Sequence, residues 1–70
     1  MPYINFYGSL GDSDKYLDGR YLDAIPRVGE RVIVPDLWDG FPRTYLRDGC
    51  ALVKEVRHDV NNNMVNVYLI

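Results

Sequence analysis

The sequence is poor in the residues that build metal centres and disulfide frameworks. Its 70 residues include one cysteine, Cys50, and one histidine, His58. A single cysteine forms no intramolecular disulfide, and these two side chains do not complete a four-ligand zinc site. The composition therefore excludes a small domain that is stabilised by an intramolecular disulfide bond or by a zinc ion. It fits a soluble protein of the cytoplasm, where thiols stay reduced.

Long apolar runs and phosphate-binding glycine loops are also missing. No apolar run approaches the roughly 18 residues of a membrane span. The first residues, Met-Pro-Tyr-Ile-Asn, lack the basic start and apolar block of a signal peptide. No glycine-rich loop precedes a helical pattern, so the common nucleotide-binding motifs are absent. A nucleotide held between subunits by loop aromatics and arginines would leave no such motif, and this alternative stays open.

The chain also has no excess of positive charge. The net charge is −2, from eight Lys and Arg against ten Asp and Glu. Nucleic-acid binding depends mainly on neutralising phosphates, so this balance disfavours it. The basic residues recur after an acidic stretch at 12–23, however, and one face can still be locally basic. A nucleic-acid-binding barrel would use Arg27, Arg31, Arg43, Arg47 and Arg57.

Catalytic constellations are absent as well. Cys50 and His58 fall on one predicted strand, roughly 26 Å apart if it is straight, which is far beyond hydrogen-bond reach. Residues 12–14 (Asp-Ser-Asp) resemble the start of a calcium loop, but Leu17 and Asp23 replace its required glycine and closing glutamate. We expect no enzymatic activity, no cofactor and no metal.

What the sequence does contain is a series of short β-strand signals separated by turn residues. A chain of this length supports one core, so residues 1–70 are expected to form one domain. The patterns predict an all-β fold, a small SH3-like barrel of five or six short antiparallel strands with no long helix. Strand patterns fall at residues 3–7, 20–25, 31–34, 50–58 and 64–70.

The first part of the chain gives mixed signals. In 3–7, Ile4 and Phe6 share one face and the tyrosines at 3 and 7 share the other. Residues 8–14 are turn formers that end this strand, and 13–19 predict either a single helical turn or, by preference, an irregular loop. In 20–25 the apolar pattern slips, which predicts a bulge near Asp23 or Ala24.

The second half of the chain alternates more regularly. Residues 52–56 break the alternation and predict a bulge or a strong bend. The asparagines at 61–63 predict a turn, since asparagine tolerates left-handed backbone. In the last strand Val65, Val67 and Leu69 form the core face, with Asn66 and Tyr68 opposite.

A corner at residues 25–35 organises these strands. Pro26 cannot donate to a strand ladder, and Gly29 supplies the freedom for a change of direction. Val28 is expected to cover the end of the core, and Glu30 to accept backbone N–H groups of the turn. Pro35 ends the strand that follows.

The corner also carries a resemblance. The pattern Ile-Pro-x-Val-Gly-Glu-x-Val at 25–32, Val-x-x-Val-x-His at 53–58 and Val-x-Val-Tyr-Leu at 65–69 resembles small uncharacterised proteins of bacteriophages and other mobile elements. The resemblance covers residues 25–34 and 50–70. It implies an SH3-like barrel and a phage setting, and it implies no catalytic residue.

The irregular stretch at 35–49 is the predicted partner-binding site. Aromatic and arginine side chains together have the composition of an interface hot spot, and the variable loops of small barrels often bind partners. A small barrel also needs large residues to plug its ends, so Trp38 has a structural alternative in the core. The predicted partner-binding residues are Trp38, Phe41, Arg43, Tyr45 and Arg47.

Tyrosine is abundant, with six in the chain. Tyr3, Tyr7 and Tyr68 fall opposite the core faces of their strands. Such a surface suits a homodimer interface, a peptide groove or a platform for single-stranded nucleic acid, and the acidic balance favours the first two. We therefore expect a non-catalytic, phage-encoded protein that binds a protein partner, for example as an inhibitor of a host defence or regulatory protein, and that can form a homo-oligomer.

Overall fold

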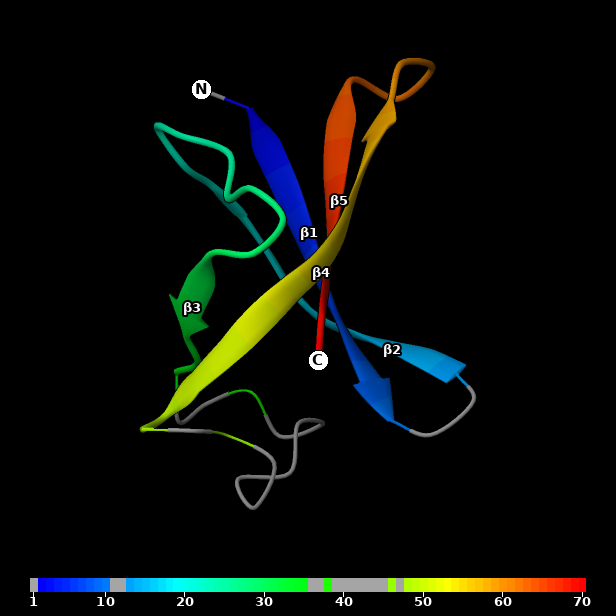
Figure 1. Cartoon of the computed structure of the whole chain (residues 1–70). Coiled ribbons are helices and arrows are strands. Elements are labelled where there is room, and N and C mark those ends of the chain that lie inside the picture. Colours follow the sequence, from blue (N-terminus) through cyan, green and yellow to red (C-terminus); the bar gives the residue numbers. More distant parts are fainter. Residues whose placement is uncertain (1, 11–12, 36–37, 39–45, 47) are drawn as a thin grey trace.

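The computed structural model describes residues 2–10, 13–35, 38, 46 and 48–70, and it contains five strands (Figure 1). They hydrogen bond in the order β2-β1-β5-β4-β3, and the twisted sheet curls into a half-barrel. Neither a helix nor a helical turn occurs in these residues, so the all-β prediction is confirmed. The strands are β1 (Tyr3–Leu10), β2 (Ser13–Tyr21), β3 (Arg31–Ile33), β4 (Cys50–Asp59) and β5 (Met64–Leu69).

The prediction that all strands run antiparallel is wrong for one pair. β1 and β5 lie side by side at the centre of the sheet and run parallel, in a register from Tyr3 with Met64 to Gly8 with Leu69. This register sets Phe6 beside Val67, so both strands bury their apolar sides on one face. Alternation predicts which side is buried but says nothing of strand direction, because the period is the same either way.

The core lies on the concave face of the half-barrel. Phe6, Ile4, Leu69, Val53 and Val67 are its largest fully buried side chains. The predicted core faces of β1 and β5 are thus confirmed. Four further buried residues complete this core: Val34, Trp38, Ala51 and Val65.

The first hairpin is longer than predicted. β1 continues through Gly8 to Leu10, and β2 occupies residues where a helical turn or an irregular loop was predicted. Gly8 pairs with Lys15 on one side and Leu69 on the other, so ladders on both sides hold a segment whose composition favours a turn. The expected strand at 20–25 ends at Tyr21.

The bulge in this hairpin is also displaced. The register shifts between Phe6, which pairs with Asp18, and Tyr7, which pairs with Tyr16. Leu17 is the extra residue, and no bulge forms in a strand at 23–24 because that segment is not a strand. With the extra residue, both Tyr16 and Asp18 keep partners on β1.

The corner forms largely as expected. Gly29 has a φ of 91°, which requires glycine's freedom. The Glu30 carboxylate accepts the backbone N–H of Arg27 at 2.6 Å, which confirms the predicted link and lowers the pKa of Glu30. The role given to Val28 is wrong. Its side chain is 63% exposed, because the backbone of Gly29 bonds to Val53 and turns residue 28 outward.

The predictions for the terminal hairpin are confirmed. β4 carries a register shift between Val53 and Glu55, within the segment where alternation broke down. The turn after β4 contains Asn63 at φ 56°, a left-handed conformation that asparagine tolerates. The bulge leaves Val53 and Val56 both facing the core side, which resolves their irregular spacing.

Candidate functional site

Tyrosines from three strands come together on the convex face of the sheet. Alternation points Tyr3 and Tyr7 away from the core, and the register then sets partners beside them. Tyr7 pairs with Tyr68 of β5 and with Tyr16 of β2, while Tyr3 pairs with Tyr21. We name this surface the tyrosine face; it consists of Tyr3, Tyr7, Tyr16, Tyr21 and Tyr68.

The rings of the tyrosine face touch one another. Tyr7 stacks on Tyr68, with ring centroids 5.0 Å apart and planes 16° from parallel, and meets Tyr16 edge to face at 5.6 Å. Tyr3 and Tyr21 form a second edge-to-face pair at 4.9 Å. Aromatic pairs at such distances each stabilise a structure by about 0.5–1.5 kcal/mol beyond their burial. The face is therefore a preformed surface on rigid strands.

A glycine and two amides lie between the two groups of rings. A Cβ at Gly19 would collide with the Tyr3 hydroxyl and lie 2.7 Å from the Tyr16 hydroxyl, so the two phenols meet over the glycine. Partial burial and the neighbouring Tyr3 raise the pKa of Tyr16. Beside them the Asn5 amide donates to Asn66 at 3.1 Å. The face thus carries phenol hydroxyl groups between its rings, above the buried Asn5 amide.

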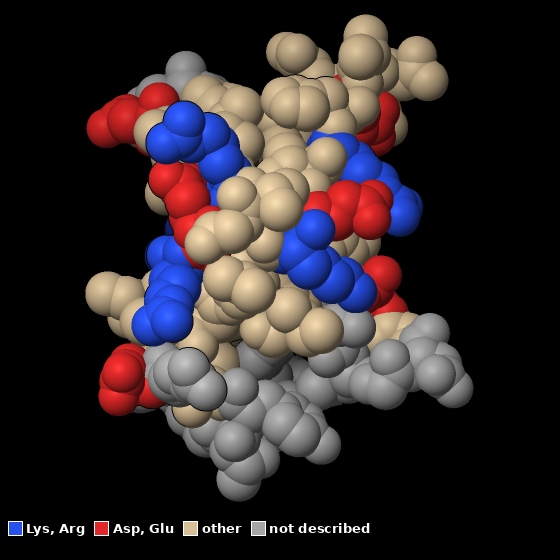
Figure 2. Space-filling model, in the orientation of Figure 1, with Lys and Arg blue, Asp and Glu red and all other residues tan. Residues whose placement is uncertain are grey.

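Positive charge near the tyrosine face is largely paired. The Arg57 guanidinium lies over the Tyr68 ring at 4.8 Å and forms an ion pair with Glu55, which raises the pKa of Arg57. Lys54 lies 3.3 Å from a carboxylate oxygen of Asp14. Figure 2 shows acidic side chains close to most of the basic ones on the face it presents. This arrangement leaves little unpaired positive charge for a phosphate backbone.

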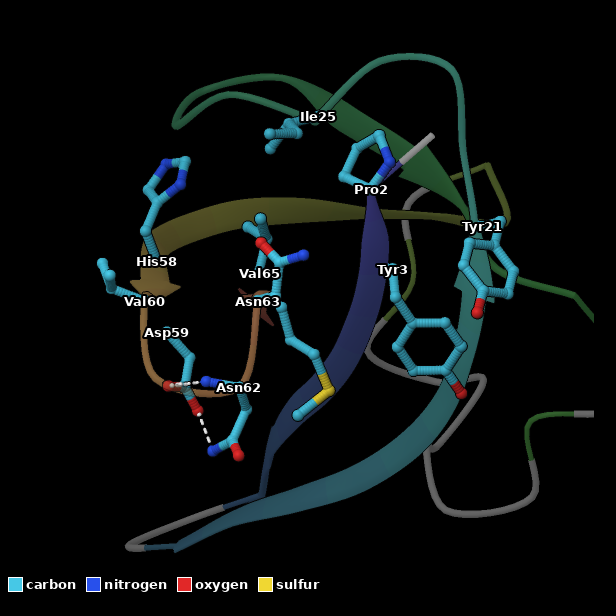
Figure 3. Close-up of a pocket in the computed structure, with 11 residues that line it drawn as sticks. Pro2, Tyr3, Tyr21, Ile25, His58, Asp59, Val60, Asn62, Asn63 and Val65 are labelled. Atoms are coloured by element: carbon cyan, nitrogen blue, oxygen red, sulfur yellow. Dashed lines mark hydrogen bonds between the residues drawn. The ribbon is translucent and has the colours of Figure 1, made fainter.

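A hollow of about 880 Å³ opens next to the tyrosine face, at the end of the half-barrel. Tyr3 and Tyr21 line one side of it, and the turn between β4 and β5, with His58 and Val60, lines another (Figure 3). Ile25, Pro2, Met64 and Val65 add to its apolar lining. Pockets of about 300–1,000 Å³ hold small ligands or a partner's side chain, so this hollow extends the surface available for binding.

Trp38 lies in the core rather than at the surface. Its side chain is 6% exposed, and its ring lies 5.1 Å from the Phe6 ring. The indole N–H donates to Asp18 on β2 at 3.2 Å, and the Arg20 guanidinium lies 5.7 Å from the ring. This is the structural alternative that the sequence left open. The other predicted partner-binding residues, Phe41, Arg43, Tyr45 and Arg47, lie outside the described residues and stay predictions.

The bond between Trp38 and Asp18 predicts an acid transition that tryptophan fluorescence reports. Hydrogen bonds from Arg20, and then from Trp38, lower the pKa of Asp18 below its ordinary value of 3.8. A lowered carboxyl pKa stabilises the fold above the unfolded pKa, and the contribution is lost as pH falls through the folded value. We expect the emission of Trp38, the only tryptophan, to change below pH 3.8, and the Asp18→Asn variant to lose this step. An unchanged step in that variant would contradict the prediction.

The arginines of the nucleic-acid alternative are not gathered in the described part of the chain. Arg27 pairs with Glu30 in the corner, Arg31 lies on β3 and Arg57 lies near the far end of β4. Arg43 and Arg47 fall outside the described residues. The three arginines that can be placed therefore form no basic groove.

Other chemical groups of the chain lie apart. Cys50 and His58 occupy opposite ends of β4. Within the described residues, no group of three or more His, Cys, Asp or Glu side chains is arranged to hold a metal ion. A helix long and apolar enough to cross a membrane is likewise not found in that part of the chain.

Sequence reasoning identified only part of the tyrosine face. Tyr3, Tyr7 and Tyr68 follow from strand alternation. The sequence does not predict Tyr16 on this face, because residues 13–19 resemble a loop. It does not predict Tyr21 there either, because the expected strand covers residues 20–25, whereas β2 ends at Tyr21. The signal in the sequence is the spacing of the tyrosines: Tyr7 lies three residues before the end of β1, and Tyr16 lies three residues after the start of β2.

The chain matches no protein family model, no curated protein and no solved structure.

Proposed function

We propose that this protein is a non-catalytic binding module that recognises a protein partner through the tyrosine face. The observation that carries the proposal is the contact between tyrosine rings from three neighbouring strands on an open sheet face. Tyrosine is enriched at binding hot spots because its ring gives large contact area at a low cost in conformational entropy. Ring contacts on regular strands reduce that cost further.

A protein partner suits this surface better than a nucleic acid. Aromatic rings alone would also stack bases, but single-stranded nucleic acid binding needs a positive groove along the backbone. Here Arg57 and Lys54 are both paired with carboxylates, and the net charge is negative. The phenol hydroxyl groups between the rings suit the hydrogen-bonding groups of a polypeptide.

The setting we propose is that of a phage-encoded protein in the cytoplasm of its host. The resemblance of the corner to small phage proteins supports this setting. The five-stranded half-barrel is compatible with an SH3-like barrel, although the parallel pairing of its central strands is a distinct feature. In such a setting the module would act by covering a surface of a host defence or regulatory protein.

The test is to remove exposed aromatic surface without touching the core. In the Tyr16→Ser/Tyr21→Ser double variant, both replaced side chains are more than half exposed. Loss of a tyrosine hot spot costs about 2 kcal/mol or more, roughly 30-fold in affinity. We expect the double variant to bind a partner captured from host extract, then purified, at least 30-fold more weakly by calorimetry.

The Val28→Ser variant is the matched control, because Val28 and Tyr21 are almost equally exposed (63% and 64%) and Val28 lies outside the tyrosine face. It should bind like the wild type, and circular dichroism should show that both variants are folded. Equal binding by the double variant would refute the role of the tyrosine face. Salt-sensitive binding of a labelled oligonucleotide by the wild type would favour the nucleic-acid alternative instead.

A further inference from the structure

β3 is an edge strand whose outward backbone groups are available for pairing. Towards β4, hydrogen bonds join Val34 to Gly49 and Glu30 to Val53. Antiparallel ladders alternate between bonded and non-bonded pairs, so Arg31 and Ile33 direct their N–H and C=O groups away from β4. No bond to these groups is found among the described residues. An unpaired edge of this kind is a template for another strand.

On the convex face this edge exposes apolar surface beside Arg31. Ile33, in β3, is 78% exposed. Leu52 on the neighbouring strand is also exposed, and its backbone bonds reciprocally to that of Ile70, a third exposed apolar residue. Figure 2 shows an uncharged strip between two groups of charged side chains. The edge thus continues into an apolar surface.

The length of this edge limits what can pair with it. Pro35 follows it closely on one side, and on the other the backbone N–H of Gly29 already bonds to Val53. Only the short stretch around Val32 remains open, so a long strand of another protein would gain no further bonds. A partner whose own edge strand is equally short therefore fits the open stretch of β3 better.

We propose that a second copy of this chain pairs with β3 in an antiparallel, twofold-symmetric dimer centred on Val32. In this register Arg31 of one copy lies opposite Ile33 of the other, and their outward groups form reciprocal hydrogen bonds on both sides of the axis. The sheet then continues from one copy into the next, and Ile33 packs beside the Arg31 stem of the partner copy.

Charge supports a second copy as the occupant. Arg31 lies at one end of the edge, and Asp48 lies just beyond the residues that face its other end. Both are exposed, and neither forms an ion pair within the described part of the chain. Antiparallel pairing brings the Arg31 end of each copy to the Asp48 end of the other. Two edges of the same chain therefore complement each other in charge as well as in length.

The dimer leaves the tyrosine face open. β3 lies at one edge of the sheet, whereas the tyrosines lie on β2, β1 and β5 towards the other. A dimer through β3 would therefore carry two tyrosine faces and could bind a repeated target with higher avidity than one copy. This inference does not depend on the identity of the partner of the tyrosine face.

The first test is the mass in solution, measured by analytical ultracentrifugation over a range of protein concentrations. We expect the wild type to be a dimer and the Ile33→Lys variant to be a folded monomer, with dimer dissociation raised by at least tenfold. Val60→Lys is the matched control, because it places the same charge on an exposed apolar position in the turn between β4 and β5, away from β3. A monomeric wild type, or a variant dimer of unchanged stability, would overturn the proposal.

The second test is the register of pairing, by disulfide cross-linking in a Cys50→Ser background. Non-bonded antiparallel pairs have Cα atoms about 4.5 Å apart, within disulfide range, so the Val32→Cys variant should cross-link to its own copy. Two copies of residue 33 are offset by two residues along the strand, about 7 Å, and lie about 5 Å apart across it, so their Cα atoms are about 8 Å apart and beyond the roughly 7 Å limit. The Ile33→Cys variant should therefore not cross-link. The reverse pattern would refute pairing centred on Val32.

Discussion

The Trp38→Ala variant is expected to lose most of the protein's free energy of unfolding. Trp38 packs against Phe6 in the core, donates to Asp18 and lies beside Arg20. Truncating a buried tryptophan to alanine costs about 3–5 kcal/mol, through lost burial and the cavity that remains. Small domains commonly have total stabilities near the lower end of 5–15 kcal/mol. Urea unfolding followed by circular dichroism measures the loss.

The Trp38→Phe variant separates packing from hydrogen bonding at the same position. It keeps most of the apolar contact with Phe6 but loses the donor to Asp18, so we expect a smaller loss, about 1–2 kcal/mol. A Trp38→Ala variant as stable as the wild type that fails to bind a partner would instead make Trp38 an interface residue.

The position of Trp38 explains why its loss should be severe. The sheet ends in two edge strands, β2 and β3, and a half-barrel must cover the opening between them. Trp38 follows β3 in the chain, yet its indole reaches Asp18 on β2. This single side chain therefore connects the two edges across the core. A large aromatic side chain such as Trp38 can thus serve either a binding interface or the closure of a small barrel.

The sequence predicts best where structure depends on near neighbours. The core faces of β1 and β5, the bulge near residue 54 and the turn at Asn63 follow from alternation and turn chemistry. The bond from Arg27 to Glu30 lies within one turn and could also be predicted. Each of these features is decided by residues a few positions apart.

Features that depend on distant partners were predicted less well. β2 forms because β1 offers a ladder and tyrosine partners to residues that alone favour a loop. The parallel pairing of β1 with β5 joins segments about 60 residues apart, which no local pattern encodes. The tyrosine face combines both cases. Its β1 and β5 members were predicted, while its β2 members required the register of the hairpin.

The Val67→Asp variant should be unfolded, whereas its neighbour Asn66→Asp should be folded. Val67 is fully buried on the central strand β5, between Phe6 and Val56 in the register. An unpaired carboxylate there has no donor, and burying such a charge costs more than about 4 kcal/mol. Asn66 lies on the convex face, where an aspartate would still accept from the Asn5 amide, so we expect a loss of about 1 kcal/mol or less.

This pair of variants places the same side chain on opposite faces of one strand. The circular dichroism of each variant, with a urea titration of any variant that is folded, therefore measures how unequal the two faces are. The proposed binding function requires that the convex face be open, because only an open face presents the tyrosines. A large loss at both positions would show that the convex face is also buried in solution. In that case the tyrosine face would be an interface between copies of this chain, and β3 would no longer be its main edge of association.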